Sequence, residues 1–235
     1  MDPTSLETRC ADAWPPLVSK PLGDWRLRAC DGYTGRANSA LAVGDPGIPV
    51  AQALEAVVGF ADEQRIRPCV QVIVGSETES AVAAAGWSIN LAHPKGAESS
   101  VLVSTQAVPG PAAVVAESPP AGWFELVVGA TPSAAQRHLL TSGPRVGFAS
   151  VHRDGSLVGA ARGCVVDGYL HISVVEVAVS HRRQGIGREL LAGLDSWADV
   201  SRRVLQVGVG NSGALALYAG LGYSESHRYR YWIPA

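Results

Sequence analysis

The stretch Val177-Ala-Val-Ser-His-Arg-Arg-Gln-Gly-Ile-Gly-Arg-Glu-Leu-Leu191 decides the fold of this chain. It begins as an apolar strand, passes through a basic turn with Gly185 and Gly187, and continues with apolar residues at helical spacing. The first N–H groups of a helix have no partner within the helix, and the helix dipole adds positive charge there. The stretch therefore predicts a strand, a loop and a helix N-terminus that can bind a phosphate or pyrophosphate.

The residues of the turn suit an anion, but they have a simpler interpretation. Gly185 and Gly187 lack a Cβ, so an anion can approach the backbone, and Arg182 and Arg183 add mobile positive charge. A glycine turn before a surface helix with a solvated basic edge accounts for the same residues. The order of the elements around the turn has to decide between the two.

Composition limits the function classes. The chain has 235 residues, 47% of them hydrophobic and 17% charged, with a formal net charge of −2. This balance predicts no general attraction to nucleic acid or to an anionic membrane, so a phosphate site must be local. The four cysteines are far apart and lack metal-ligand spacing, which predicts no metal site and no disulfide framework. We find no signal peptide and no apolar run of membrane-spanning length, and we expect a cytoplasmic protein.

The hydrophobic pattern predicts two α/β halves. In the first we expect strands at 25–29, 39–43, 70–74 and 100–103 and helices at 50–61 and 77–85. In the second we expect a helix at 132–140, strands at 146–151, 157–165 and 170–177 joined by two Asp-Gly turns, the helix after Gly185, a strand at 204–209, a helix at 211–219 and a strand at 228–233. Thr131 is the expected N-cap of the helix at 132–140. The first twenty residues are expected to be loosely attached, and 227–230 to lie at the surface on an edge strand.

The two halves share a pattern. Gln71-Val-Ile-Val-Gly75, an alanine-rich helix and Gly86-Trp87 parallel Gln206-Val-Gly-Val-Gly210, an alanine-rich helix and Gly222-Tyr223. Such a long period indicates two copies of one α/β unit. The copies differ where chemistry is expected, because Gly44-Asp-Pro-Gly47 lacks the basic residues of the second copy. We predict an N-terminal domain at 1–108, a linker rich in Pro, Gly, Ala and Val at 109–122, and a catalytic domain at 123–235.

The second half resembles the GNAT acetyltransferase superfamily. The resemblance covers about Trp123 to Pro234 and rests on Arg182-Arg-Gln-Gly-Ile-Gly187 between strand and helix, on Asn211-x-x-Ala214-x-x-x-Tyr218, and on Leu221-Gly-Tyr223. The first half looks like a degenerate copy of the same fold. The implied fold is α/β (α+β), with tandem units that each contain a mixed, mostly antiparallel sheet flanked by helices. The chain also looks like certain actinobacterial two-domain acetyltransferases, some of the N-acetylglutamate synthase type.

The resemblance implies acetyl-CoA as the acetyl donor and no metal. The loop would bind the CoA pyrophosphate, and the strand before it would bind the pantetheine arm through its main chain. The implied cofactor-binding residues are Val177, Ala178, Val179, Arg182, Arg183, Gln184, Gly185, Ile186, Gly187, Arg188, Asn211, Ala214 and Tyr218. Asn211 begins a helix, so its role as an N-cap is an equal alternative or an additional one.

The implied reaction is direct attack of an amine on the thioester, which needs a general acid and a base. The family places a tyrosine such as Tyr218 beside the CoA sulfur as general acid, although buried helical tyrosines are often purely structural. His171 and Glu176 are the two candidate bases, and strand alternation puts them on opposite faces unless a bulge intervenes. Gln206 stands where some relatives carry a glutamate and cannot serve as a base, so proton removal through ordered water is a further option.

Other functions fit parts of the pattern. The chain could be a catalytically silent acyl-CoA sensor, a nucleotide-binding regulator or a protein N-acetyltransferase. We expect a small-molecule amine such as an amino acid as acceptor, no nucleic acid or membrane partner, and a monomer or homodimer.

Overall fold

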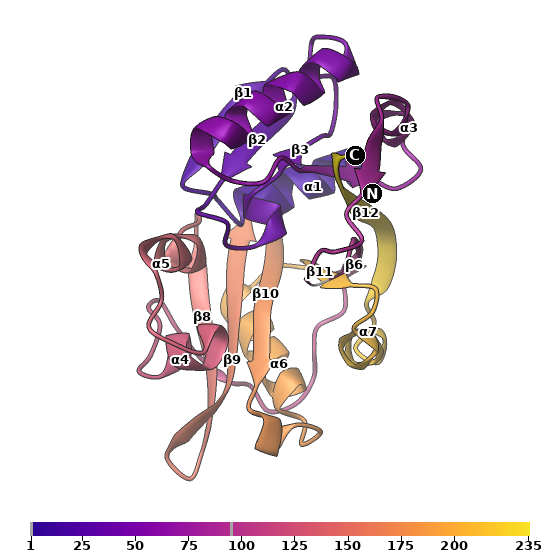
Figure 1. Cartoon of the computed structure of the whole chain (residues 1–235). Coiled ribbons are helices and arrows are strands. Elements are labelled where there is room, and N and C mark those ends of the chain that lie inside the picture. The colour runs from indigo at the N-terminus through magenta and orange to yellow at the C-terminus, as the bar shows by residue number, and fades with distance from the viewer. Residues whose placement is uncertain (1, 95) are drawn as a thin grey trace. The chain divides into compact units, whose positions relative to one another are not determined.

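The computed structural model describes residues 2–94 and 96–235 (Figure 1). Its contacts divide the chain into two compact units. Unit 1 comprises residues 1–101, 207–211 and 225–235, and unit 2 comprises residues 102–206 and 212–224. Both units are therefore assembled from separate stretches of the chain, and the predicted domain limits at 108 and 123 stay a prediction.

Unit 1 is built on a mixed sheet in the strand order β1-β2-β3-β4-β12-β6, with β5 paired to β12. Only β3 and β4 among the described pairs of this unit run parallel, while β1–β2, β2–β3, β4–β12 and β5–β12 are antiparallel. The strands are β1 (Val18–Leu22), β2 (Trp25–Ala29), β3 (Ala40–Leu41), β4 (Val70–Ile73), β5 (Trp87–Ile89), β6 (Glu98–Ser104) and β12 (Ser224–Pro234).

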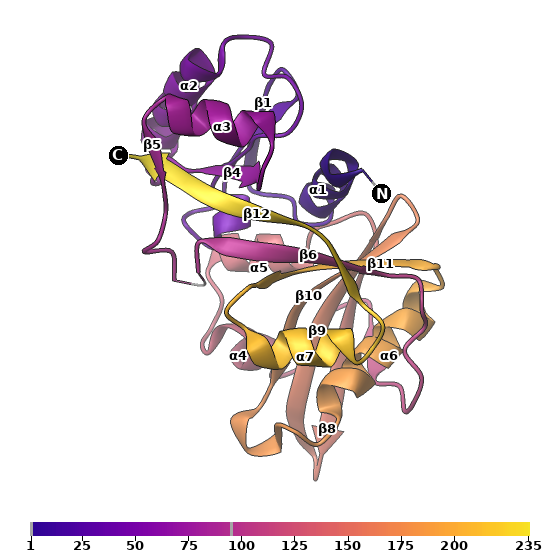
Figure 2. The same ribbon diagram turned by 90° about the vertical axis from the view of Figure 1, so that its right-hand side faces the viewer.

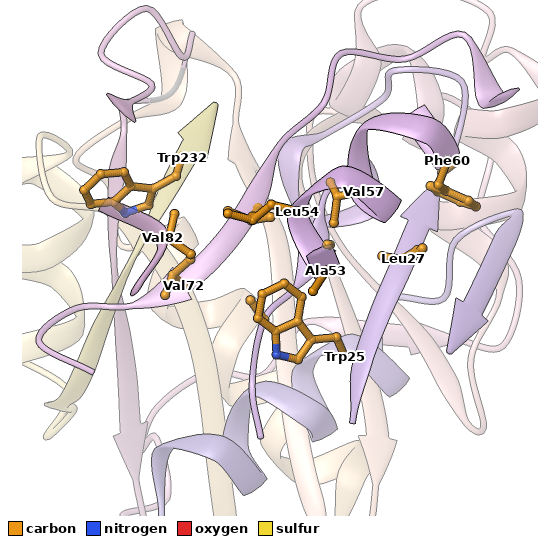
Figure 3. Packing of buried hydrophobic residues seen from close by; sticks show 13 residues of the cluster. Trp25, Leu27, Ala53, Leu54, Val57, Phe60, Val72, Val82 and Trp232 are labelled. Carbon is orange, nitrogen blue, oxygen red and sulfur yellow. The ribbon is translucent and has the colours of Figure 1, made fainter. Parts of the chain in front are cut away.

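The core of unit 1 lies between its sheet and the helix α2 (Val50–Gln64). Apolar residues at helical spacing, such as Leu54 and Val57, face buried residues of the strands, such as Trp25 and Val72 (Figure 3). The unit also contains α1 (Pro3–Asp12), the 3-10 turn η1 (Gly35–Ala37) and α3 (Glu77–Ala84).

The first twenty residues are not loosely attached, so that expectation was wrong. The Asp2 side chain accepts hydrogen bonds from the N–H groups of Thr4 and Ser5, which caps α1, and Pro3 opens the helix. Leu6 and Glu7 of this helix are almost completely buried. The capping pattern was readable in the sequence, but the polar composition of the segment concealed it.

The C-terminal strand was also placed wrongly at a sheet edge. β12 lies between β4 and β6 in unit 1, so its residues are central. The His227 side chain is only 7% exposed, and its Nε2 lies 3.0 Å from Oε1 of Glu7 on α1. Arg230 donates from Nε to Glu98 at 2.7 Å. Ion pairing within the unit accounts for this basic run, although Arg228 lies at the surface as predicted.

Unit 2 contains a sheet in the order β11-β10-β9-β8-β7. β10 and β11 run parallel, and β7–β8, β8–β9 and β9–β10 are antiparallel. Both Asp-Gly hairpins are confirmed, since all four turn residues have positive φ, as type I′ turns require. The strands are β7 (Val114–Ala116), β8 (Val146–Arg153), β9 (Ser156–Val166), β10 (Tyr169–Val177) and β11 (Arg202–Gly208), of which β7 lies within the predicted linker.

Helices cover both faces of this sheet (Figure 2). On one face α6 (Ile186–Ala198) packs so closely that a Cβ on Gly147 of β8 would lie 2.7 Å from the Trp197 ring. The next residue, Phe148, points to the opposite face and meets Trp123 at 5.2 Å between ring centroids. That second face carries α4 (Trp123–Val128), which the pattern did not predict, and α5 (Ala134–Thr141).

The start of α5 differs from the expectation. Ser133, not Thr131, is its N-cap: Ser133 Oγ accepts from Gln136 N, and the Gln136 side chain accepts from Ser133 N. This reciprocal pair is a capping box, which satisfies two backbone donors at once and outcompetes a cap two residues earlier.

Candidate active site

The loop predicted to bind an anion has the expected strand–loop–helix form. After β10 the chain forms the 3-10 turn η2 (Val179–His181), and α6 begins at Ile186. Arg182 donates from Nε to the Val177 carbonyl at 3.2 Å, which folds the loop back on the end of the strand. Gly185 has a φ of +83°, a conformation that favours glycine, and it is the N-cap residue of α6.

The N-terminus of α6 is open. Gly185 has no side chain to cap the helix, and within residues 2–94 and 96–235 no side-chain cap is recorded for its first N–H groups. Arg182, Arg183 and Arg188 are exposed, and within the described residues none of the three forms an ion pair with a carboxylate. Free donors and unpaired positive charge at one place are what a phosphate ester needs.

Gly187 has a packing role as well. A Cβ at this position would lie 3.0 Å from Cδ2 of Leu217 on α7 (Ser212–Ala219). The first turn of α6 therefore approaches α7 closely, and α7 carries the predicted acid Tyr218. This glycine thus brings the open helix end and the tyrosine-bearing helix together.

A bulge in β10 changes the direction of Glu176. Ser173 pairs with Arg162 of β9, and the next described pair joins Glu176 to Ala160, so three steps on β10 match two on β9. The extra residue reverses the alternation of side chains beyond it. His171, which pairs with Cys164, and Glu176 therefore lie on the same face of the sheet. They would lie on opposite faces in a regular strand.

The bulge contains a strained residue. Val174 has a φ of +47°, a region that β-branched side chains rarely occupy. Such a conformation costs on the order of 1–3 kcal/mol and is maintained only where the surrounding structure enforces it. The sequence contains no glycine at this point, so no sequence pattern indicated the bulge.

Tyr218 is buried and electrostatically coupled to Glu176. Burial, followed by the negative charge of Glu176, raises the pKa of Tyr218 to about 12. Its ring lies 5.7 Å from that of Tyr223, whose N–H donates to the Tyr218 carbonyl at 3.0 Å. The Tyr218 hydroxyl thus stays protonated near neutral pH and can donate a proton.

The two candidate bases have different surroundings. His171 is completely buried, and Arg162, which is itself fully buried, is its diagonal neighbour on β9. Glu176 is only half-buried and, within the described part of the chain, has no ion pair with an arginine. Of the two, Glu176 is the group that acts electrostatically on Tyr218.

The remaining predicted residues lie at the end of β10 and at the start of α7. Val177 and Ala178 are half-buried at the end of β10, whereas Val179 is 76% exposed. Asn211 is exposed immediately before α7, and Ala214 is half-buried in its first turn. Their roles toward a cofactor stay a prediction.

The structure also shows residues that sequence reasoning missed. Arg162 and Ser173 face the same side of the sheet as Glu176. The one available signal was an arginine inside the apolar run 157–166. Across residues 2–94 and 96–235, no group of three His, Cys, Asp or Glu side chains could hold a metal ion. No helix in the same residues has the length and apolar character to cross a bilayer.

Comparison with known proteins assigns the family. Residues 3–232 match the model of a family described as "Probable histone acetyltransferase Rv0428c C-terminal". The chain belongs to the GNAT N-acetyltransferase family. It is 26% identical to the uncharacterized N-acetyltransferase YobR of Bacillus subtilis (strain 168), over 97% of this chain and 98% of that protein.

Solved GNAT structures share the fold. A GCN5-related N-acetyltransferase from Kribbella flavida has a TM-score of 0.69 at 18% identity and covers 97% of this chain and 94% of its own. A tandem GNAT protein from the clavulanic acid biosynthesis pathway has a TM-score of 0.64 at 17% identity, over 97% and 86% of the two chains. The predicted fold class, a mostly antiparallel mixed sheet flanked by helices, is confirmed, and this chain is an N-acyltransferase of GNAT type.

Proposed function

We propose that this GNAT protein transfers an acetyl group from acetyl-CoA to a primary amine by direct attack. The proposal rests above all on the bulge in β10, which directs Glu176 to the face where it is coupled to Tyr218. The open N-terminus of α6, with its free donors and unpaired arginines, supplies the adjacent anion site. The acid on α7, the carboxylate on β10 and the phosphate loop before α6 all belong to unit 2.

The donor fits the loop from Arg182 to Arg188. Backbone N–H groups at the start of α6 hold the pyrophosphate, and the exposed arginines neutralise its charge. Val177, Ala178 and Val179 offer main-chain groups to the pantetheine arm, with Asn211 and Ala214 on the side of α7. All of these residues are among those predicted from the sequence.

Glu176 and Tyr218 divide the proton transfers. The amine nitrogen attacks the thioester carbonyl carbon, and Glu176 takes the proton that the nitrogen loses, directly or through water. The C–S bond then breaks, and the sulfur receives the Tyr218 hydroxyl proton. His171 contributes to the buried framework rather than to proton transfer, because its side chain is completely buried.

A small-molecule amine such as an amino acid is the proposed acceptor, with glutamate as one candidate. The description of the matching family favours a second class, a lysine side chain of a protein. A test compares glutamate, free lysine, spermidine and a lysine-containing histone-tail peptide as acceptors, with thiol release from acetyl-CoA as the signal. We expect release with at least one free amine.

Binding must be measured beside turnover. Intrinsic tryptophan fluorescence during titration with acetyl-CoA, CoA and ATP reports occupancy of the donor site. Binding of acetyl-CoA without thiol release for any amine would convert the proposal into an acyl-CoA sensor. Equal binding of ATP would remove the basis of the donor assignment and favour a nucleotide-binding regulator.

A further inference from the structure

Arg162 is a fully buried arginine on β9 that lies on the same face of unit 2 as Glu176. Its Nε donates to the Leu140 carbonyl at 2.9 Å, and its Nη2 donates to the Ser142 carbonyl at 2.5 Å. Both acceptors belong to the end of α5, where carbonyl groups lack partners within the helix. One guanidinium therefore attaches the C-terminus of α5 to the sheet.

The same guanidinium reaches the start of the bulge. Arg162 is the cross-strand partner of Ser173, the last regular pair before the bulge, and its Nη1 lies 3.5 Å from Ser173 Oγ. The strained Val174 follows at once, and the regular pairing resumes at Glu176. A strained backbone persists only where its neighbours support it. Arg162, which lies opposite Ser173 at the start of the bulge, is in a position to give that support.

The turn after α5 also closes over this guanidinium. Gly143 has a φ of +146°, and a Cβ there would lie 3.2 Å from Nη2 of Arg162 and 2.8 Å from Sγ of Cys164. The turn can therefore pass this close only as glycine. Arg162 is thus enclosed by α5, its following turn and β10, and a side chain in such an environment has little freedom to move.

We propose that Arg162 is a positioning residue, which holds the bulge of β10 against the end of α5 and thereby keeps Glu176 directed toward Tyr218. Arg162 makes no contact with substrate in this role. Without the guanidinium, Leu140 and Ser142 lose a donor, and Ser173 loses the group that faces it. The bulge can then relax, and the Glu176 side chain is no longer held toward Tyr218. This inference rests on the proposed function for its kinetic consequence but not for its structural one.

Arg145 supplies a matched control. It is also an arginine that binds the last carbonyls of a helix, with Nη2 to Trp197 at 2.6 Å and Nη1 to Ala198 at 3.1 Å at the end of α6. It does not face the bulge. Arg162→Lys and Arg145→Lys therefore make the same chemical change at two helix ends, and only the first should affect Glu176.

The structural test is hydrogen–deuterium exchange of peptides that cover 173–177, with neither donor nor acceptor present. We expect Arg162→Lys to speed exchange there by about tenfold or more, and Arg145→Lys to leave it unchanged. If Arg162→Lys does not fold, Ser173→Ala removes only the contact at the bulge and should increase exchange by about three- to tenfold. Unchanged exchange at 173–177 in the folded variants overturns the proposal.

The kinetic test combines Arg162→Lys with Glu176→Gln in a double-mutant cycle, using the panel amine that the wild-type enzyme acetylates fastest. Arg162→Lys alone should lower kcat at least about tenfold, with the KM for acetyl-CoA within about twofold. In the Glu176→Gln background it should change kcat by less than about twofold, because both changes act on one group. Additive losses overturn the proposal. If wild type acetylates no amine, the proposed function fails, and the exchange experiment alone decides the role of Arg162.

Discussion

The acidity of the Tyr218 hydroxyl is set by its surroundings in unit 2. Burial and the neighbouring charge of Glu176 both oppose ionisation, which is why the pKa of Tyr218 rises to about 12. A group whose pKa is raised in this way keeps its proton through the neutral and mildly alkaline range. It can serve as an acid there, whereas an exposed tyrosine would begin to ionise near pH 10.

Tyr218→Phe tests this role. We expect kcat to fall about 100-fold, within the usual range for loss of a general acid, while acetyl-CoA affinity changes little. Because the pKa of Tyr218 is raised to about 12, ionisation of its hydroxyl should cause no loss of wild-type activity between pH 7 and 9. Wild type and Tyr218→Phe should therefore have pH profiles of the same shape in this range. The measurement is the initial rate of thiol release from acetyl-CoA across this pH range. Full activity in the variant would make Tyr218 a packing residue.

Replacing Tyr223 with Phe should change the free energy of unfolding in the opposite direction from the same change at Tyr229. Within the described residues, its buried hydroxyl has no hydrogen-bond partner, whereas the equally buried Tyr229 hydroxyl bonds to Ser99 and Tyr231. An unsatisfied buried hydroxyl costs about 1–3 kcal/mol. Tyr223→Phe should therefore raise the free energy of unfolding in urea, and Tyr229→Phe should lower it. A loss of stability in both variants would show that Tyr223 has a partner such as bound water.

At the scale of elements, the same strand–loop–helix arrangement appears in both units, but only the loop of unit 2 carries arginines. In unit 1 the residues before α2 close on themselves. Asp24 Oδ2 accepts from Asp45 N at 2.8 Å, Asp45 Oδ1 accepts from Gly47 N at 2.8 Å, and Asp45 O accepts from Asp24 N at 2.7 Å. These carboxylates occupy two backbone donors of the loop and add negative charge, which opposes a phosphate, although α2 itself has no side-chain cap.

We therefore predict one acetyl-CoA site per chain. Isothermal titration should give a stoichiometry near one for wild type and affinity lower by about tenfold or more for the double change Arg182→Gln with Arg183→Gln, because the loop of unit 2 then keeps only one of its three exposed arginines. The change Asp24→Asn with Asp45→Asn is the control in unit 1 and should leave the stoichiometry at one. A value near two for wild type would show that the closed loop opens.

Gly187 tests the approach of α6 to the donor and to α7. Gly187→Leu should weaken acetyl-CoA binding about tenfold or more, because the added side chain meets Leu217 and intrudes on the open helix end. Gly59→Leu in α2 is the control, since a Cβ there meets nothing within 4 Å. Fluorescence titration with acetyl-CoA measures the affinity, and the melting temperature monitors packing. Unchanged affinity in Gly187→Leu would argue against this loop as the donor site.

At the scale of the whole molecule, chain order and structural unit do not coincide. The last strand of the chain is a central strand of unit 1, although the sequence around it resembles the end of the catalytic half. Residues 207–211 belong to unit 1 too. A C-terminal fragment that begins after residue 108 or 122 would therefore carry strand residues that belong to unit 1.

Removal of residues 225–235 tests this arrangement. We expect unit 1 to lose its fold, since β4 and β5 lose their partner β12 and Glu7 loses the His227 contact. Limited proteolysis should then cut within residues 1–101 and spare 146–198 longer. Removal of residues 2–12, which also exposes unit 1 but leaves its sheet complete, is the milder control. Cutting confined to unit 2 after the C-terminal truncation would contradict the division.

The sequence by itself determined the elements that local patterns specify. Apolar runs separated by Asp-Gly turns predicted β8, β9 and β10, and the spacing of Ile186, Leu190 and Leu194 predicted α6 and its buried face. Apolar spacing and turn chemistry act between neighbouring residues, so they can be read without the fold. The basic loop and Tyr218 were also predicted, because their residue types and spacing are unusual in combination.

Only the tertiary structure decided which residues meet. The bulge at Val174 moves Glu176 to the face of His171 and Arg162. The central position of β12 depends on pairing with strands more than a hundred residues away in sequence. Strand order and side-chain direction beyond an irregularity come from long-range pairing, which leaves no periodic pattern in the chain itself.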